Sequence, residues 1–220
     1  MRGDGDGWMI SPDGSRQWGR HGAAGLLLRA PLADGRAVVL LQHRAVWSHQ
    51  GGTWGVPGGA RDSHESAVHA AVREAGEEAG IAADSLRVRA ELVTARAASG
   101  WTYTTVVADT AEPLATVRNR ESAELRWVVE DEVAGLALHP GFGAAWTTLR
   151  AEPVRLLVHD LDRTAAAELL AALPRTIGLP GGGFGWLAGD DRVAAARTAV
   201  LADPVPDGAE LAFTRAQVLS

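Results

Sequence analysis

Three glutamates lie close together within residues 59–81, and their spacing could support metal chemistry. Glu74, Glu77 and Glu78 stand at positions i, i+3 and i+4, so a helix would place them on one face. Carboxylates packed in this way repel one another, and the C-terminal end of a helix also disfavours negative charge. A bound divalent cation would offset both the repulsion between the carboxylates and the unfavourable helix dipole. Mg²⁺ and Mn²⁺ suit this role, because these ions prefer oxygen ligands and bind substrate phosphates. A solvated acidic helix face is the alternative interpretation of such a run.

The neighbouring residues predict the helix that would carry these carboxylates. Residues 66–79 are rich in Ala, Glu and Val, and Ser63 and Ser66 are candidate caps at its start. Gly80 stands where a left-handed residue commonly ends a helix. Gly76 inside the helix costs about 1 kcal/mol relative to alanine, but it removes no metal ligand.

The complete spacing of this stretch resembles the signature of the Nudix hydrolase family. Five residues separate Gly59 from Glu65, and seven more lead to residues 73–81, which read REAGEEAGI. So many matched positions favour the metal site over a solvated acidic face, although Ala75 stands where a larger aliphatic residue is usual. The resemblance implies hydrolysis of a diphosphate linkage with Mg²⁺, or Mn²⁺, as the cofactor.

The same resemblance implies roles for individual residues. Glu74 and Glu78 would be the principal metal ligands, with Glu77 and the backbone carbonyl of Gly58 as further ligands. Arg73 would orient the carboxylates through charge-assisted hydrogen bonds rather than touch the substrate.

Three glutamates are candidates for the base that takes a proton from the attacking water. In MutT-like family members, a Glu near Trp127 is often this base or an extra metal ligand. Glu121 fits that loop position better than Glu124, which would lie within a strand. Glu78 is the third candidate, and Glu65 is expected to support the site from outside the metal's ligand shell.

Substrate contacts are expected from residues that precede the helix. Arg44, at a strand end, is a candidate for a phosphate contact, with an exposed structural arginine as the alternative. Trp47 and Trp54 could stack on a base. Their alternative role is to pack in the core or anchor the loop between residues 46 and 59.

The hydrophobic pattern predicts an α/β protein with a mixed sheet. Helices on both sides of that sheet would give a Nudix-type α/β/α sandwich. We expect a flexible lead at residues 1–17, a Nudix hydrolase domain at 18–150 and a small C-terminal α/β accessory segment at 151–220. Strands are expected at residues 18–29, 37–44, 54–56, 86–97, 101–109 and 124–129, and helices at 66–79, 130–136 and 142–150.

The C-terminal segment matches no family pattern. Strands are expected at residues 154–158 and 210–214, and helices at 164–173 and 191–201. The glycine-rich residues 179–189 read as a loop, and they lack the Gly-Lys-Ser/Thr of a phosphate-binding loop. The segment is a candidate for a cover over the active site or for a homodimer interface.

Composition narrows the class of protein. The net charge of −6 gives no general attraction to nucleic acid backbones, and the absence of cysteine excludes disulfides and thiolate chemistry. No apolar run is long enough to span a membrane. We therefore expect a cytoplasmic enzyme with a small-molecule diphosphate substrate and no nucleic acid or membrane partner.

The expected substrate is a nucleoside di- or triphosphate, or a related nucleoside diphosphate compound. The chain lacks the additional sequence motifs that are typical of family members acting on ADP-ribose, diadenosine polyphosphates or coenzyme A. One alternative is an enzyme that hydrolyses a nucleotide sugar or a non-nucleotide diphosphate. Another is a catalytically silent binding or regulatory module, although such modules usually lose signature carboxylates and this chain retains all of them.

Overall fold

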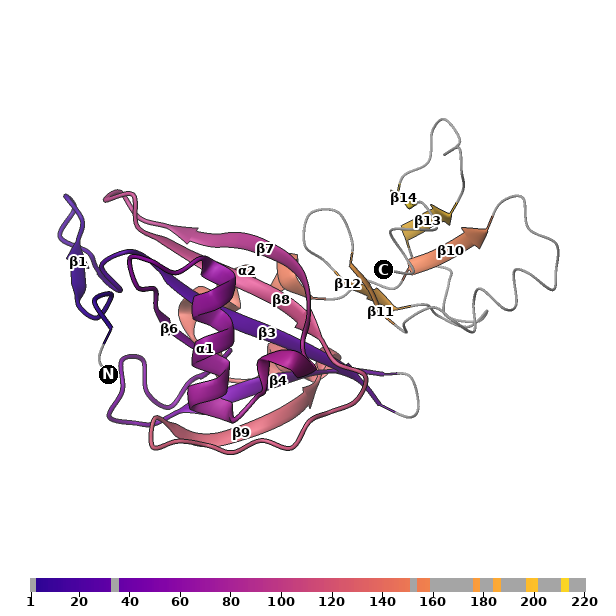
Figure 1. The fold of residues 1–220 in the computed structure, drawn as a ribbon, viewed down its shortest axis with the longest axis horizontal. Helices are drawn as coiled ribbons and strands as arrows, with labels where there is room; N and C mark the ends of the chain where they lie inside the picture. The colour runs from indigo at the N-terminus through magenta and orange to yellow at the C-terminus, as the bar shows by residue number, and fades with distance from the viewer. Residues whose placement is uncertain are drawn as a thin grey trace. The chain divides into compact units, whose positions relative to one another are not determined.

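The computed structural model describes residues 3–32 and 36–150, together with the backbone of five short strands between residues 154 and 213 (Figure 1). The chain divides into two compact units, Met1–Thr148 and Leu149–Ser220. The first unit contains every residue of the predicted site. Among the described residues, no helix is both long and apolar enough to cross a membrane.

A seven-stranded mixed sheet forms the centre of the first unit. Five strands follow the order β5-β4-β3-β8-β7, while β6 pairs with β3 and β9 pairs with β4. The β3–β8 pair is parallel, and the other pairs are antiparallel. The strands are β3 Ala23–Pro31, β4 Ala37–Arg44, β5 Trp54–Gly55, β6 Gly58–Ala60, β7 Arg87–Arg96, β8 Thr102–Asp109 and β9 Ser122–Val129.

Helices cover this sheet, which confirms the predicted α/β class. The main helix, α1 (Ala67–Ala79), crosses the front of the sheet in Figure 1, and α2 (Pro140–Leu149) is drawn behind the strands. Short 3-10 helices occupy Ala83–Ser85 and Glu130–Gly135. The core behind α1 is formed by its buried alanines and by apolar side chains of β3, β4 and β8. Because alanine is small, α1 can approach the sheet closely and hold its carboxylates near the strand backbone.

The predicted ends of α1 are confirmed. The Ser66 hydroxyl accepts a hydrogen bond from the backbone N–H of His69 at 3.1 Å, as an N-terminal cap should. Gly80 ends the helix with a left-handed φ of 70°, and its N–H bonds to carbonyls of the last turn. Ser63 is not the cap, because its hydroxyl bonds the Asp4 carboxylate.

The N-terminal residues contain structure that the sequence interpretation did not anticipate. Strands β1 (Trp8–Ile10) and β2 (Arg16–Trp18) pair antiparallel within the expected flexible lead. Gly14 supplies the positive φ of 80° between them. Three-residue strands are too short to give a period-two signal, so the sequence read as a loop.

The described residues of the second unit form two small sheets. Parallel pairing joins β10 (Val154–Val158), β13 (Arg197–Leu201) and β14 (Leu211–Phe213), while β11 (Thr176–Gly178) pairs antiparallel with β12 (Phe184–Trp186). Both strands expected here are present.

Two expectations for the second unit were wrong. Residues 197–201 form a strand rather than the end of a helix, and the β-branched Thr198 and Val200 favour that outcome. Residues 184–186 are a strand within the expected loop. The helix expected at 164–173 lies outside the described residues.

Candidate active site

The α1 glutamates differ strongly in their burial. Glu78 is 4% exposed, and its Oε2 accepts a hydrogen bond from the Gly58 N–H at 2.8 Å. The Glu74 side chain is largely buried, whereas that of Glu77 is exposed. The helix therefore presents two sheltered carboxylates against β6 and a third toward solvent.

Arg73 connects these carboxylates to the loop before the helix. Its Nη1 donates to Glu74 Oε1 at 2.7 Å, its Nε donates to Glu65 Oε1 at 2.7 Å, and its Nη2 donates to the Ala60 carbonyl at 2.9 Å. Glu77 Oε2 lies 3.6 Å from Nη1. These bonds support the orienting role expected for Arg73 and the supporting role expected for Glu65.

The site favours positive charge. Burial raises the pKa of the Glu78 carboxyl to about 7, and the neighbouring charge of Glu74 acts in the same direction. Burial also raises the pKa of Glu74, with smaller contributions from Glu77 and Glu121. In contrast, the Arg73 hydrogen bond lowers the pKa of Glu65. A cation near Glu74 and Glu78 would offset the cost of their ionisation.

Glycines allow β6 to lie closely between β3 and the carboxylates of α1. A Cβ atom at Gly58 would lie 2.5 Å from the Ala24 carbonyl oxygen, and one at Gly59 would lie 2.5 Å from Glu74 Oε1. Only glycine fits both positions without displacing its neighbours. The Gly58 carbonyl therefore belongs to a strand held within reach of Glu78.

This donor set suits a hard divalent cation. Glu74, Glu77 and Glu78, with the Gly58 carbonyl, offer only oxygen atoms, and no cysteine exists to supply sulfur. Glu78 is a carboxyl whose burial works against its ionised form, and a bound cation would offset that effect. The residues thus fit the Mg²⁺ or Mn²⁺ that the sequence resemblance implies.

A cleft of about 830 Å³ lies over these carboxylates. Its lining combines the acidic residues with Arg44, Arg73 and Arg120, so anions and cations can both be held there. Glu121 also lines this cleft, whereas Glu124 lies 3.8 Å from Arg126 in a surface ion pair. The two candidate bases outside α1 are therefore separated, with Glu121 beside the acidic residues.

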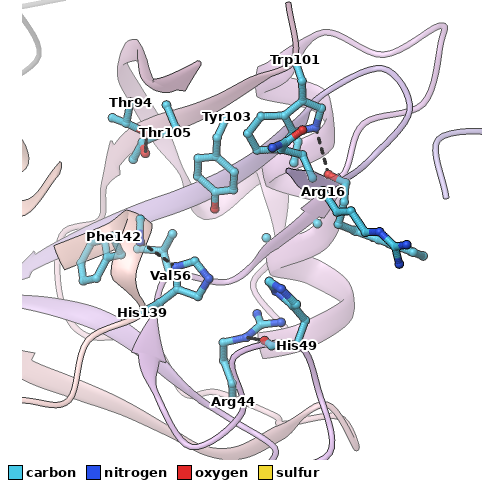
Figure 2. A pocket seen from close by; sticks show the side chains of 18 residues that line it. Arg16, Arg44, His49, Val56, Thr94, Trp101, Tyr103, Thr105, His139 and Phe142 are labelled. Atoms are coloured by element: carbon cyan, nitrogen blue, oxygen red, sulfur yellow. Dashed lines mark hydrogen bonds between the residues drawn. The ribbon is translucent and has the colours of Figure 1, made fainter. Parts of the chain in front are cut away.

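A smaller cavity of about 200 Å³ adjoins the cleft. Its lining includes the aromatic side chains of Trp18, Trp101, Tyr103 and Phe142, and Figure 2 shows the Tyr103 hydroxyl pointing into it with the His139 ring facing that hydroxyl. Five residues line both cavities, namely Trp18, Arg44, His49, Gly58 and Gly59. The acidic cleft and the aromatic cavity therefore lie side by side and share part of their walls.

His139 offers this cavity a hydrogen-bond donor. Its Nδ1 accepts a hydrogen bond from the Gly141 N–H at 3.2 Å, so the ring proton belongs on Nε2. Burial lowers the pKa of His139, which favours the neutral ring. A neutral imidazole whose Nε2–H is free can donate to a carbonyl oxygen of a bound molecule.

The residues expected to contact substrate have different surroundings. Arg44 lines both cavities, and its Nε donates to the His49 carbonyl at 3.0 Å. Trp47 is 65% exposed and lines the acidic cleft. Trp54 is buried and stacks on His43 with a centroid distance of 4.7 Å, which favours its alternative role as an anchor of the loop.

Several residues of the site were not found from the sequence. They are Trp8, Trp18, His49, Trp101, Tyr103, His139 and Phe142. They come from the N-terminal hairpin, the loop after β4, the turn before β8 and the strand itself, and the residues around the start of α2, so no local pattern connects them.

Known proteins resemble this chain across most of its length. The NUDIX domain model matches residues 19–149. The chain is 60% identical over 190 residues to "Putative 8-oxo-dGTP diphosphatase 3" of Mycobacterium tuberculosis, which covers 84% of this chain and 85% of that protein. The crystal structure of a Nudix hydrolase from M. smegmatis, RenU, aligns with a TM-score of 0.63 and 67% identity over 65% of this chain and 91% of that one. The chain therefore belongs to the Nudix family of hydrolases.

Proposed function

We propose that the protein hydrolyses a nucleoside triphosphate, or a related nucleoside diphosphate compound, in a Mg²⁺-dependent reaction. The observation that carries this proposal is that an acidic cleft and an aromatic cavity lie side by side and share five lining residues. The cleft suits metal-bound phosphates, and the cavity suits a planar base. Water would attack phosphorus and break one anhydride bond, giving a nucleoside monophosphate and pyrophosphate from a triphosphate.

Glu74, Glu77 and Glu78, with the Gly58 carbonyl, would hold the metal. The chemistry that Mg²⁺ would supply at these residues is neutralisation of the phosphate charge and a binding position for the attacking water. Arg73 keeps the Glu74 carboxylate oriented by their 2.7 Å hydrogen bond.

Arg44 would bind phosphate, because it lines both cavities and lies where the two meet. Trp47 is a further candidate for contact with the substrate at the exposed rim of the cleft.

Glu121 would take the proton from the attacking water. Its side chain is exposed in the acidic cleft, where a water molecule can reach it, whereas Glu78 is buried and would be occupied as a metal ligand. We expect Glu121→Gln to lower kcat by about 100-fold or more. Glu124→Gln removes the charge of a nearby carboxylate outside the cleft and should leave kcat within about threefold of the parent. Equal effects of the two variants would remove Glu121 from this role.

The 60% identical relative is named for 8-oxo-dGTP, so an oxidised purine nucleotide is a candidate substrate. A carbonyl oxygen on such a base would accept a hydrogen bond from the neutral His139 ring. The two nearest alternatives are a nucleotide sugar or non-nucleotide diphosphate as substrate, and ligand binding without turnover.

A substrate panel tests the proposed function. We expect Mg²⁺-dependent release of pyrophosphate from at least one nucleoside triphosphate, with activity abolished by EDTA. The panel would include 8-oxo-dGTP, dGTP, other nucleoside triphosphates, dinucleotides, nucleotide sugars and prenyl diphosphates. Turnover of only the last two classes would favour the alternative substrates. Tight binding of one compound without turnover of any would favour a silent module.

A further inference from the structure

The N-terminal hairpin, residues 8–18, precedes the matched NUDIX domain but contributes to its site. The domain match begins at residue 19. Trp8 lines the acidic cleft, Arg16 and Gln17 line the aromatic cavity, and Trp18 lines both. Figure 2 places Arg16 and Trp101 on one side of the aromatic cavity. The site therefore includes residues that the family match does not cover.

Contacts with separate loops hold this hairpin in place. On one side, Trp101 Nε1–H donates to the Trp18 carbonyl at 3.1 Å, and Ser11 bonds Ser99 through their hydroxyls at 3.1 Å. On another side, the Trp8 ring packs edge-on against His49 at 5.5 Å between centroids. These contacts join the hairpin to the β7–β8 turn and to the loop after β4.

The residues just before the hairpin attach to a third loop. The Gly5 N–H donates to Asp62 at 2.7 Å, and the Ser63 hydroxyl donates to Asp4 at 2.6 Å. Both partners lie between β6 and α1, next to the catalytic helix. The hairpin is thus fixed to three loops around the mouth of the site.

The two hairpin tryptophans keep much of their surface open despite these contacts. Trp8 is 45% exposed and Trp18 is 40% exposed, and their rings meet edge-on at 5.3 Å with an interplanar angle of 77°. Large aromatic side chains that line a cavity and remain partly open are typical of surfaces that bind planar groups. Among the five residues common to both cavities, Trp18 is the one that offers a large aromatic face.

We propose that the hairpin is a specificity element of the active site and that Trp18 stacks on the base of the nucleotide. This proposal rests on the proposed function. A ligand with phosphates in the cleft and a base in the aromatic cavity would lie within reach of Trp18, because that residue borders both spaces. Trp8 is a positioning residue, since its edge-on contacts with Trp18 and His49 fix the orientation of the Trp18 ring.

The test compares Trp18→Ala with Trp18→Phe and with Ile10→Ala. Ile10 is an exposed apolar residue of the same hairpin and is absent from the lining of both cavities. For a nucleoside triphosphate turned over by the parent, we expect Trp18→Ala to raise KM about 10-fold or more, with kcat within about threefold. Trp18→Phe should recover most of this loss, and Ile10→Ala should match the parent.

Binding measured by calorimetry separates this proposal from the proposed function. The same nucleotide, titrated with Mg²⁺ into each variant, should bind Trp18→Ala about 10-fold more weakly than the parent. Trp8→Ala should show a smaller loss that Trp8→Phe restores. Far-UV circular dichroism verifies that each variant is folded. Parental KM and affinity in Trp18→Ala would overturn the specificity role while leaving hydrolysis by the parent intact. A parent that neither binds nor hydrolyses nucleotides would overturn both proposals.

Discussion

Replacement of Glu78 by Gln is expected to lower kcat/KM for a responsive nucleotide by about 100-fold or more in Mg²⁺. Gln preserves the size of the side chain and can still accept the Gly58 N–H, which bonds Glu78 Oε2 at 2.8 Å in the parent. The change therefore removes a charge rather than a packing contact. The loss should follow from weaker metal binding, because a neutral amide is a poorer ligand for Mg²⁺ than a carboxylate.

Glu132→Gln is the matched control for this experiment. Glu132 is an exposed carboxylate in the 3-10 helix Glu130–Gly135 and lines neither cavity, so its replacement should leave kcat/KM near the parental value. Mn²⁺ titration followed by electron paramagnetic resonance would show whether Glu78→Gln binds metal more weakly. Activity of Glu78→Gln within about threefold of the parent would remove Glu78 from the metal site.

Helix α1 could be predicted because the sequence features that define it are local. Glu74 and Glu78 share a face through helical periodicity alone, and Ser66 and Gly80 mark the ends of the helix by their own conformational preferences. The orienting contact between Arg73 and Glu74 joins adjacent residues in the chain. None of these features depends on how distant parts of the protein pack.

The aromatic cavity could not be predicted, because it depends on contacts between distant residues. Trp101 bonds the Trp18 carbonyl across 83 positions of sequence, and His139 reaches the same cavity from the start of α2. Each of these residues taken alone also fits a packing role. Only the parallel pairing of β3 with β8 brings Tyr103 beside Ala23 and sets one wall of the cavity.

Tertiary structure distinguishes candidates that the sequence leaves equivalent. Trp47 and Trp54 are equivalent candidates by residue type and by their positions around one loop. In the structure, Trp54 is 8% exposed and Trp47 is 65% exposed. Similarly, Glu121 and Glu124 differ by three positions, but strand β9 directs Glu124 toward Arg126 and leaves Glu121 in the cleft. Periodicity gives the face of an element, whereas the neighbours of that face come from tertiary structure.

The metal-free protein is expected to lose stability as pH rises from about 5 to about 8. The pKa of the Glu78 carboxyl is about 7 in the folded protein, above its ordinary value of 4.5. Between those values the folded state binds more protons than the unfolded state, so the free energy of unfolding falls with increasing pH. Ionisation of Glu78 lowers the free energy of unfolding by about 3 kcal/mol in total. This loss is complete once pH lies well above the pKa of Glu78 in the folded protein.

The comparison of the parent with Glu78→Gln isolates this contribution. Burial lowers the pKa of His139, so the contribution of this residue to the free energy of unfolding increases as pH rises. In the parent, this increase partly cancels the decrease caused by Glu78. Glu74 acts in the same direction as Glu78 and is retained in the variant. In EDTA at about pH 8, Glu78→Gln should unfold at a temperature several degrees above that of the parent.

Mg²⁺ should reverse this order of stability. The cation binds the ionised carboxylates of the folded protein, so it raises the melting temperature of the parent by mass action. The same addition should change Glu78→Gln much less, because the variant lacks one charged ligand. Thermal unfolding at about pH 5 and pH 8, with EDTA or with Mg²⁺, measures all of these effects. Identical pH slopes for the parent and Glu78→Gln in EDTA would contradict the raised pKa. An equal shift of both proteins by Mg²⁺ would place the metal elsewhere.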